Sequence, residues 1–161
     1  MAALEDLEAK IKYLEEIEAI KALKMKYVYS VDSQKPDDVL DCFAPDAHAD
    51  YGPFGKYETR EGLMKFFGEI LPRVLPFCCH MVHNPSIVIR GEEAKATWYF
   101  DVSCTFVPKF APRNKASLIL GRYDEDLVKV EGKWKYKRMV ANIFYFTPLD
   151  RGWVEERMMT I

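Results

Sequence analysis

The stretch Ala96-Thr97-Trp98-Tyr99-Phe100-Asp101-Val102-Ser103-Cys104-Thr105-Phe106 decides the fold class, because apolar residues occupy every second position along it. A period of two is typical of a β-strand that buries one face. Similar alternation predicts further strands over residues 117–123, 127–130 and 134–146, with a hairpin turn at Glu131-Gly132-Lys133. We therefore expect the second half of the chain to form a curved antiparallel sheet.

The first half of the chain has the spacing of helices. Apolar residues recur every three or four positions near the start, which predicts one long helix over residues 4–31. Pro36 opens a predicted short helix that runs through Phe43. Thr59 is placed to cap a third helix, which we expect Pro72 to end.

A brief strand predicted over residues 47–51 separates the second and third helices. Three helices followed by long strands indicate an α+β domain, in which a strongly curved mixed or antiparallel sheet wraps the helices as a cone-shaped barrel. No internal repeat or low-complexity linker divides the chain, so residues 1–161 are expected to form a single domain.

The charge balance argues against several classes of partner. The 161 residues include 23 Lys and Arg and 25 Asp and Glu, and no basic cluster indicates a nucleic-acid or membrane surface. No apolar run approaches the about 20 residues of a membrane span. The four cysteines form no C-x-x-C pair, which predicts reduced, buried thiols. We therefore expect a cytoplasmic protein that binds a small neutral or apolar molecule.

Two histidines lie in the run Cys79-His80-Met81-Val82-His83-Asn84-Pro85, just before a strand-like segment. Because side chains alternate along a strand, His80 and His83 are expected to point to opposite faces, so only one can face the interior. This parity argues against a metal ion held by both, and we expect no metal site. A histidine with a purely structural hydrogen bond is the alternative for either residue.

Asp32 ends the first predicted helix, where a carboxylate faces the negative end of the helix dipole at a cost of about 0.3–1 kcal/mol. A compensating partner is therefore expected. An imidazole brought to Asp32 inside an apolar cavity would make a general base with an orienting carboxylate. The alternative is that Asp32 lies at the surface and caps the turn at residues 33–35.

Five groups of residues spread over nearly the whole chain carry a family resemblance. They are Ile17-Glu18-Ala19-Ile20-Lys21; Lys26-Tyr27 with Val31-Asp32; His80 ahead of an alternating strand; Gly132-Lys133-Trp134-Lys135; and Tyr145-Phe146-Thr147-Pro148-Leu149. In them the chain resembles the SnoaL-like branch of the nuclear transport factor 2-like superfamily. Its amino-terminal half is most similar to bile-acid 7α-dehydratase and its carboxyl-terminal half to hexachlorocyclohexane dehydrochlorinase, with scytalone dehydratase a more distant relative.

The resemblance implies a cone-shaped α+β enzyme that assembles as a trimer and eliminates water or hydrogen chloride without a metal or organic cofactor. It implies an Asp-His dyad formed by Asp32 and His80. A polar pocket position on the first long helix matches Tyr27, the tyrosine of the short strand matches Tyr51, and a pocket-lining position on the last strand matches Asn142. Tyr27 would join the dyad as a catalytic residue, whereas Tyr51 and Asn142 would contact the substrate.

Two departures from these relatives make the expected pocket more apolar. Val102 stands where the bile-acid enzyme has an acidic residue, and Met139 stands where the dehydrochlorinase has an arginine. The strand period places two mainly apolar sets on inward faces, namely Trp98, Phe100, Val102 and Cys104 on one strand, and Val140, Asn142, Phe144 and Phe146 on another.

We predict substrate contacts from Trp98, Phe100, Val102 and Phe144 in this wall. Such a wall favours a ring-containing substrate such as a steroid, a polyketide or an aromatic compound. An ordinary hydrophobic core would alternate in the same way and is the alternative.

The sequence therefore predicts a cofactor-independent lyase of the dehydratase type. The phenols of Tyr27 and Tyr51 would donate hydrogen bonds to a carbonyl or a departing hydroxyl, with core packing as the alternative for both. An isomerase or cyclase with the same base, a non-catalytic binding module and a small oxygenase subunit are the alternative functions. A homotrimer is expected, with subunit contacts from Leu4, Leu7, Ile11 and Trp153.

Overall fold

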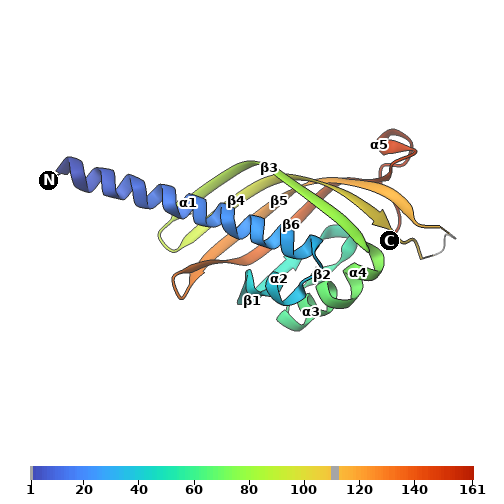
Figure 1. The fold of residues 1–161 in the computed structure, drawn as a ribbon, viewed down its shortest axis with the longest axis horizontal. Helices are drawn as coiled ribbons and strands as arrows, with labels where there is room; N and C mark the ends of the chain where they lie inside the picture. The colour runs from blue at the N-terminus through green and yellow to red at the C-terminus, as the bar shows by residue number, and fades with distance from the viewer. Residues whose placement is uncertain (1, 110–112) are drawn as a thin grey trace.

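Six strands form one curved sheet against which the helices pack (Figure 1). The computed structural model describes residues 2–109 and 113–161. The strands are β1 (Phe43–Asp50), β2 (Lys56–Tyr57), β3 (Phe77–Arg90), β4 (Glu93–Phe106), β5 (Lys115–Val130) and β6 (Lys133–Pro148). The helices are α1 (Ala2–Asp32), α2 (Pro36–Asp41), α3 (Arg60–Lys65), α4 (Leu71–Val74) and α5 (Gly152–Glu155), with a 3₁₀ turn η1 (Gly52–Phe54) and a π-helical segment η2 (Phe66–Ile70).

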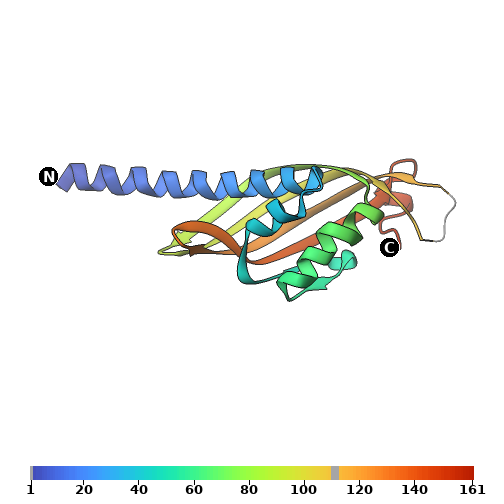
Figure 2. The same ribbon diagram turned by 60° about the horizontal axis from the view of Figure 1, so that its bottom comes forward.

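The sheet is mixed and open. Its strand order is β2-β1-β6-β5-β4-β3, and β1 runs parallel to β6 while the other neighbouring pairs run antiparallel. Because the order ends at β2 and β3, the expected barrel is not closed by strand pairing. Helices cover one face of the bent sheet instead, which confirms the α+β class (Figure 2).

Burial along β4 confirms the pattern that decided the fold class. From Ala94 to Phe106 every second side chain is buried, and the side chains between them are more exposed. Glu131 and Gly132 adopt positive φ values of 50° and 75° in the two-residue turn between β5 and β6. The inward face of β4 is therefore apolar, and the predicted hairpin turn is confirmed.

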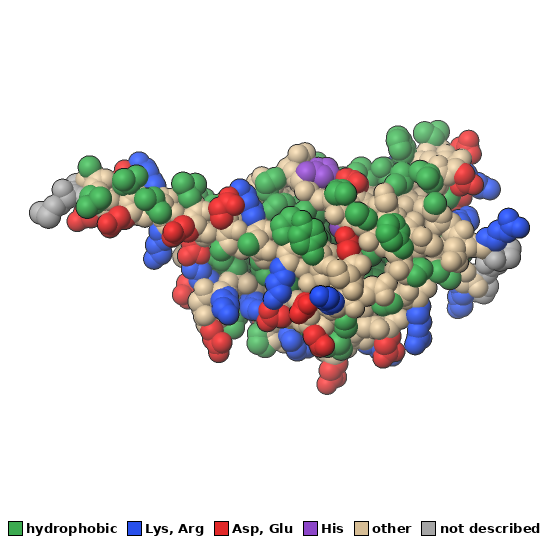
Figure 3. Space-filling view, in the orientation of Figure 1, with side chains coloured by type: hydrophobic (Ala, Val, Ile, Leu, Met, Phe, Trp, Pro, Cys, Tyr) green, Lys and Arg blue, Asp and Glu red, His purple; other side chains and the backbone are tan. Residues whose placement is uncertain are grey.

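Helix α1 has two parts. Its second part packs on the sheet from Glu16 onward, where Glu16 accepts hydrogen bonds from Lys129 Nζ and, at 2.6 Å, from Trp134 Nε1. Residues 3–15 are exposed and project beyond the end of the sheet, with hydrophobic side chains on their surface (Figures 1, 2 and 3). Among the described residues, no helix combines the length and the apolarity that crossing a membrane requires.

The third helical segment differs from the expectation at its end. Thr59 caps α3 as predicted, because its Oγ1 accepts a hydrogen bond from the backbone N–H of Gly62 at 3.1 Å. The segment continues past Pro72 to Val74, however. The π-helical turn η2 changes the hydrogen-bond register just before Pro72, so the proline falls in a new first turn where its missing N–H is not required.

Strand β1 is longer than the predicted residues 47–51. It begins at Phe43 and includes Pro45, and α2 therefore ends at Asp41. A register shift between Phe43 and His48 in the pairing with β6 accommodates Pro45, which has no N–H for a regular ladder.

Strand β6 does not keep a single period of two. Gly121 pairs with Ile143, whereas the preceding residue of β5 pairs with Tyr145, so Phe144 is left out of the ladder. This β-bulge exchanges the faces of the residues on its two sides. Ile143 therefore faces inward before the bulge and Phe146 faces inward after it.

Candidate active site

The end of α1 is tied to the start of β3, which brings Asp32 beside that strand. Gln34 follows the helix with a φ of 54°, a left-handed conformation that closes helix ends. Across this turn the N–H of Lys35 donates to the carbonyl of Ser30 at 2.9 Å. Gln34 Nε2 donates to the carbonyl of Pro76 at 2.8 Å, which fixes the turn against the residue before β3.

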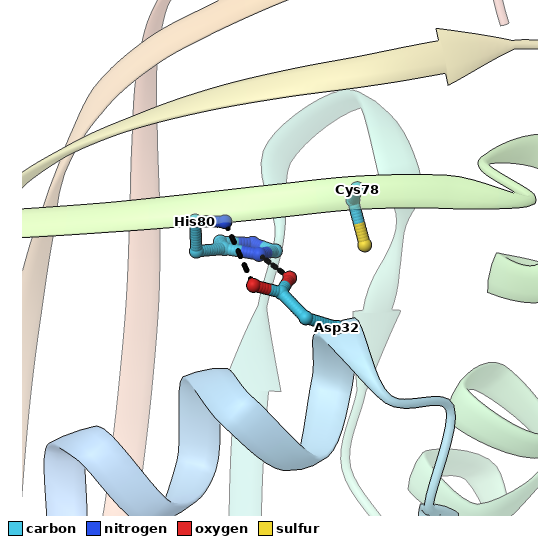
Figure 4. A group of neighbouring side chains, drawn as sticks. All are labelled: Asp32, Cys78 and His80. Carbon is cyan, nitrogen blue, oxygen red and sulfur yellow. Dashed lines mark hydrogen bonds and ion pairs between the residues drawn. The ribbon is translucent and has the colours of Figure 1, made fainter.

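Asp32 and His80 meet in a two-point contact (Figure 4). His80 Nδ1 lies 2.5 Å from Asp32 Oδ1, and the backbone N–H of His80 donates to Asp32 Oδ2 at 2.9 Å. Only 12% of the His80 side chain and 20% of the Asp32 side chain are exposed. Two residues 48 positions apart are thus held together by both carboxylate oxygens, largely shielded from water.

This contact determines which nitrogen of His80 is free. An ionised carboxylate only accepts hydrogen bonds, so Nδ1 carries the proton, while Nε2 has no hydrogen-bond partner among the described residues. Burial acts to raise the pKa of Asp32, but the hydrogen bonds from the ring and backbone of His80 outweigh it and lower that pKa. His80 is therefore the compensating partner expected for a carboxylate at this helix end.

His83 lies on the other face of β3, as strand parity predicts. Its Nε2 atom is 3.0 Å from Asp101 Oδ2, and 45% of the His83 side chain is exposed. The chain therefore holds a second His-Asp pair that uses the opposite ring nitrogen and faces solvent. This pair provides an internal comparison for His80.

His80 lines an apolar cavity of about 50 Å³ between the helices and the inner face of the sheet. Of the predicted site residues, Tyr27, Tyr51, Phe100 and Val102 join it in the wall. Apolar side chains that were not predicted as site residues complete the wall, among them Val31, Phe54, Phe67, Leu75, Ile119 and Ile143. The predicted apolar cavity beside the histidine is therefore present.

Two buried tyrosines place hydroxyl groups in this wall. The hydroxyl of Tyr27 donates to that of Tyr51 at 3.1 Å, and the hydroxyl of Tyr51 lies 3.6 Å from Met139 Sδ. Burial raises the pKa of both phenols, so both keep their protons at neutral pH. The ring of Tyr51 also stacks on Phe66, so these residues contribute both packing and hydrogen-bond donors to the site.

Asn142 and Phe144 do not reach the cavity, so their predicted inward orientation is wrong. Asn142 is exposed on the outer face of β6, where its Nδ2 donates to Asp124 Oδ2 at 2.7 Å. Phe144 packs against Tyr99, also outside the cavity, with ring centroids 6.1 Å apart. The bulge at Phe144 is the cause, because it gives the inward position to Ile143 instead.

A buried ion pair lies next to the cavity. Lys24 Nζ is 2.6 Å from Glu125 Oε1 and 3.4 Å from the centroid of the Tyr123 ring, which lines the cavity. Trp98 is buried, but it does not line the cavity, so the predicted substrate contact from Trp98 is wrong. Its Nε1 instead donates a hydrogen bond to Glu125 Oε2 at 2.9 Å. Burial lowers the pKa of Lys24 and raises that of Glu125, while their contact opposes both shifts.

Sequence contains a signal for this pair. Lys24 lies one helical turn before Tyr27, on the stripe that packs against the sheet, and Glu125 occupies an inward position of β5 two residues after Tyr123. A charged residue at the inward position of each element indicates that the two residues are partners.

Cys78 forms a group of three potential metal ligands with Asp32 and His80. Their ligand atoms lie within 4.8 Å of one another, and Figure 4 shows the side chains of Cys78 and His80 projecting from β3 toward the end of α1. This donor set fits a metal ion poorly. Both carboxylate oxygens already contact His80, and burial raises the pKa of the Cys78 thiol, which disfavours the thiolate that binds metals.

Cys78 is nevertheless a cavity residue, for which the sequence predicted only a reduced, buried thiol. Its spacing of two residues from His80 places both side chains on the same face of β3, and that spacing is the signal for its position. The four cysteines are free thiols, and all except the half-buried Cys79 are buried.

Comparison with known proteins connects this geometry to a family. The sequence profile of the SnoaL-like domain matches residues 12–140. Uncharacterized proteins of Mycobacterium bovis and Mycobacterium tuberculosis are 29% identical over 123 residues, which cover 75% of this chain and 80% of theirs.

Solved structures share the fold at low sequence identity. A hexachlorocyclohexane dehydrochlorinase, LinA type 2, has a TM-score of 0.79 at 20% identity over 87% of this chain and 93% of that one. A scytalone-dehydratase-like protein from Novosphingobium aromaticivorans has a TM-score of 0.75 at 22% identity over 86% and 91%. A nuclear transport factor 2-like superfamily protein from Salmonella enterica has a TM-score of 0.69 at 16% identity over 84% and 95%. The chain therefore belongs to the family of SnoaL-like domains.

Proposed function

We propose that the protein is a lyase that removes a proton from an apolar, ring-containing substrate and expels water or hydrogen chloride. The observation that carries this proposal is the contact of His80 Nδ1 with Asp32 Oδ1 at 2.5 Å beside an apolar cavity. It leaves one ring nitrogen of a cavity-lining histidine as a proton acceptor whose orientation is fixed. No group beyond the residues of this chain is needed for the proposed step.

In the proposed reaction, His80 Nε2 takes a proton from a carbon next to an activating group. The electron pair of the broken C–H bond forms a C=C bond, and the bond to the departing hydroxide or chloride breaks. Asp32 stabilises the resulting imidazolium of His80 through Nδ1. The proton on His80 Nε2 then joins the departing hydroxide to form water, or passes to solvent when chloride departs. A positioned base of this kind supplies about 10²–10⁴ in rate.

The two phenols suit the charge that develops on the substrate. Tyr27 and Tyr51 are protonated donors in the wall, and their hydroxyls lie 3.1 Å apart. In a site with little water, such donors stabilise a developing oxyanion or a leaving group more strongly than water does. Tyr27 and Tyr51 are therefore proposed to bind the polar end of the substrate, while Phe100 and Val102 contact its ring.

The volume of the cavity narrows the class of substrate. It measures about 50 Å³, whereas pockets for drug-sized ligands are usually about 300–1,000 Å³. A single substituted ring therefore fits with less movement of the wall than a fused steroid skeleton. The dehydrochlorinase with the same fold is named for hexachlorocyclohexane, a compound with one ring.

A screen of single-ring substrates tests the proposal. Chlorinated cyclohexanes and cyclic β-hydroxyketones are incubated with the protein, and mass spectrometry detects loss of hydrogen chloride or water. We expect His80→Ala and Asp32→Asn to stay folded and to lose about 10²–10⁴ of the rate. His83→Ala, which removes the exposed His-Asp pair, is the matched control and keeps full activity.

Two outcomes of this screen contradict the proposal. A product of unchanged mass would indicate an isomerase or cyclase that uses the same base. Turnover by His80→Ala at the rate of the original protein would remove the histidine from the chemistry.

A non-catalytic binding module has no use for an ionised carboxylate held against an imidazole beside an apolar cavity, which is why the enzyme is preferred. The homotrimer and the cytoplasmic location stay predictions from the sequence.

A further inference from the structure

The projecting part of α1 carries an apolar stripe that its own domain leaves uncovered. Leu4, Leu7, Ile11 and Leu14 are 60%, 52%, 48% and 61% exposed. Figure 3 shows this segment extending away from the body of the protein with hydrophobic side chains on its surface. A contiguous apolar stripe exposed to water often marks an interaction site, so a partner is expected to cover this one.

The stripe faces away from the side of α1 that packs on the sheet. At 3.6 residues per turn, the centre of the exposed stripe is rotated by nearly half a turn from the buried stripe that includes Ile20, Tyr27 and Val31. The exposed stripe is therefore not a continuation of the core of the same subunit. A partner that covers it contacts the helix from another direction.

The spacing of the stripe is that of a two-heptad coiled coil. Leu4 and Ile11 are seven residues apart at the first core position of each heptad, and Leu7 and Leu14 occupy the second. The next two core positions are Glu18 and Lys21, which form an ion pair with each other. The apolar seam therefore ends close to the point where α1 reaches the sheet.

The charges beside the seam indicate what covers it. In a parallel pair of such helices, the residue before the core position Ile11 faces the residue after Leu14 of the other helix, which brings Lys10 opposite Glu15. An antiparallel pair would instead bring Glu8 opposite Glu15. Lys10 is exposed and forms an ion pair with Asp6 at 2.6 Å within its own helix, so it is free to exchange partners.

We propose that residues 4–14 of α1 form a parallel, in-register coiled coil with the same segment of a second copy of this chain. The amino-terminal helices thereby join two copies at one end, through Leu7 against Leu7 and Leu14 against Leu14. This pairing takes the place of the homotrimer contact that the sequence predicted for Leu4, Leu7 and Ile11. This inference concerns assembly and does not depend on the reaction at His80.

Disulfide cross-linking of the full chain tests the register. In a parallel seam residue 14 lies against its own copy, so Leu14→Cys forms a covalent dimer under mild oxidation. Tyr13→Cys is the matched control, because Tyr13 is 47% exposed on the same helix but lies outside the seam. Cross-linking of Leu14→Cys no faster than Tyr13→Cys, or sedimentation that finds only monomer at the same concentration, overturns the proposal.

Charge exchange tests the pairing of Lys10 with Glu15. In the Leu14→Cys background, Lys10→Glu or Glu15→Lys places like charges together and lowers the rate of cross-linking severalfold. The double variant Lys10→Glu with Glu15→Lys restores it. Failure of the double variant to restore the rate overturns the parallel register, and docking of the stripe on another surface of a neighbour would produce that failure.

Discussion

Replacement of Lys24 by methionine measures how much the buried ion pair contributes to the fold. The side chains of Lys24 and Glu125 are both 0% exposed, and their charged atoms are 2.6 Å apart. Removing one partner of such a pair leaves the other charge buried and typically costs about 3–5 kcal/mol. For a chain of 161 residues, each kcal/mol lowers the melting temperature by about 2–4 °C, so we expect a fall of about 6–20 °C.

The pH dependence of this loss identifies its cause. Without Lys24, burial raises the pKa of Glu125 further above its value in the unfolded chain. A group with a raised folded pKa contributes stability below its unfolded pKa and loses that contribution as pH rises through the folded pKa. The free energy of unfolding of Lys24→Met should therefore be lowest at neutral pH. Part of the lost stability should return as the pH falls toward about 4.3, the ordinary pKa of Glu.

The double variant Lys24→Met with Glu125→Gln is the control. The amide oxygen introduced by Glu125→Gln can still accept the hydrogen bond from Trp98 Nε1, but no buried charge remains. Urea unfolding at neutral and at mildly acidic pH gives the free energies of the original protein and both variants. Two results refute the reasoning. One is a fall of less than about 1 kcal/mol in the free energy of unfolding of Lys24→Met. The other is a difference in that free energy between the single and double variants that does not change with pH.

Two further predictions concern the walls of the site. Gly121→Ala should lower the free energy of unfolding by about 1–3 kcal/mol, because a Cβ there would lie 2.5 Å from the carbonyl oxygen of Asn142 and 2.6 Å from the ring of Phe100. Gly68→Ala, whose Cβ would meet atoms no closer than 3.8 Å, is the control, and equal thermal melting of both variants contradicts the prediction. The lowered pKa of Asp32 means that its carboxylate contributes stability above the unfolded pKa and loses it as pH falls through the folded pKa. Asp32→Asn should therefore be less stable than the original protein at neutral pH and approach it in acid, and a constant difference across the pH range in thermal melts contradicts this.

Features set by local chemistry could be predicted from the sequence. The alternation along β4 depends only on which residues prefer water, and it is found at every second position. The opposite faces of His80 and His83 follow from the geometry of any strand. The need of Asp32 for a partner follows from its place at a helix end, although the contact with His80 was reached through the family resemblance.

Features set by tertiary context could not be predicted in this way. The bulge at Phe144 arises from the pairing of β6 with β5, and it moved Asn142 out of the cavity. The π-helical turn before Pro72 likewise depends on how the third helical segment packs. The inward positions of Lys24 and Glu125 can each be inferred from local patterns, but their contact across 101 positions depends on how α1 packs against the sheet.

The tautomer of His80 is the most direct test of the proposed base. Long-range ¹H–¹⁵N NMR of the neutral imidazoles distinguishes a proton on Nδ1 from one on Nε2. The contact with Asp32 predicts that His80 carries its proton on Nδ1 and has a bare Nε2, whereas His83, whose Nε2 faces Asp101, carries its proton on Nε2. A proton on Nε2 of His80, or the mixture of tautomers typical of a histidine in water, would contradict the proposal that Asp32 prepares His80 as a base.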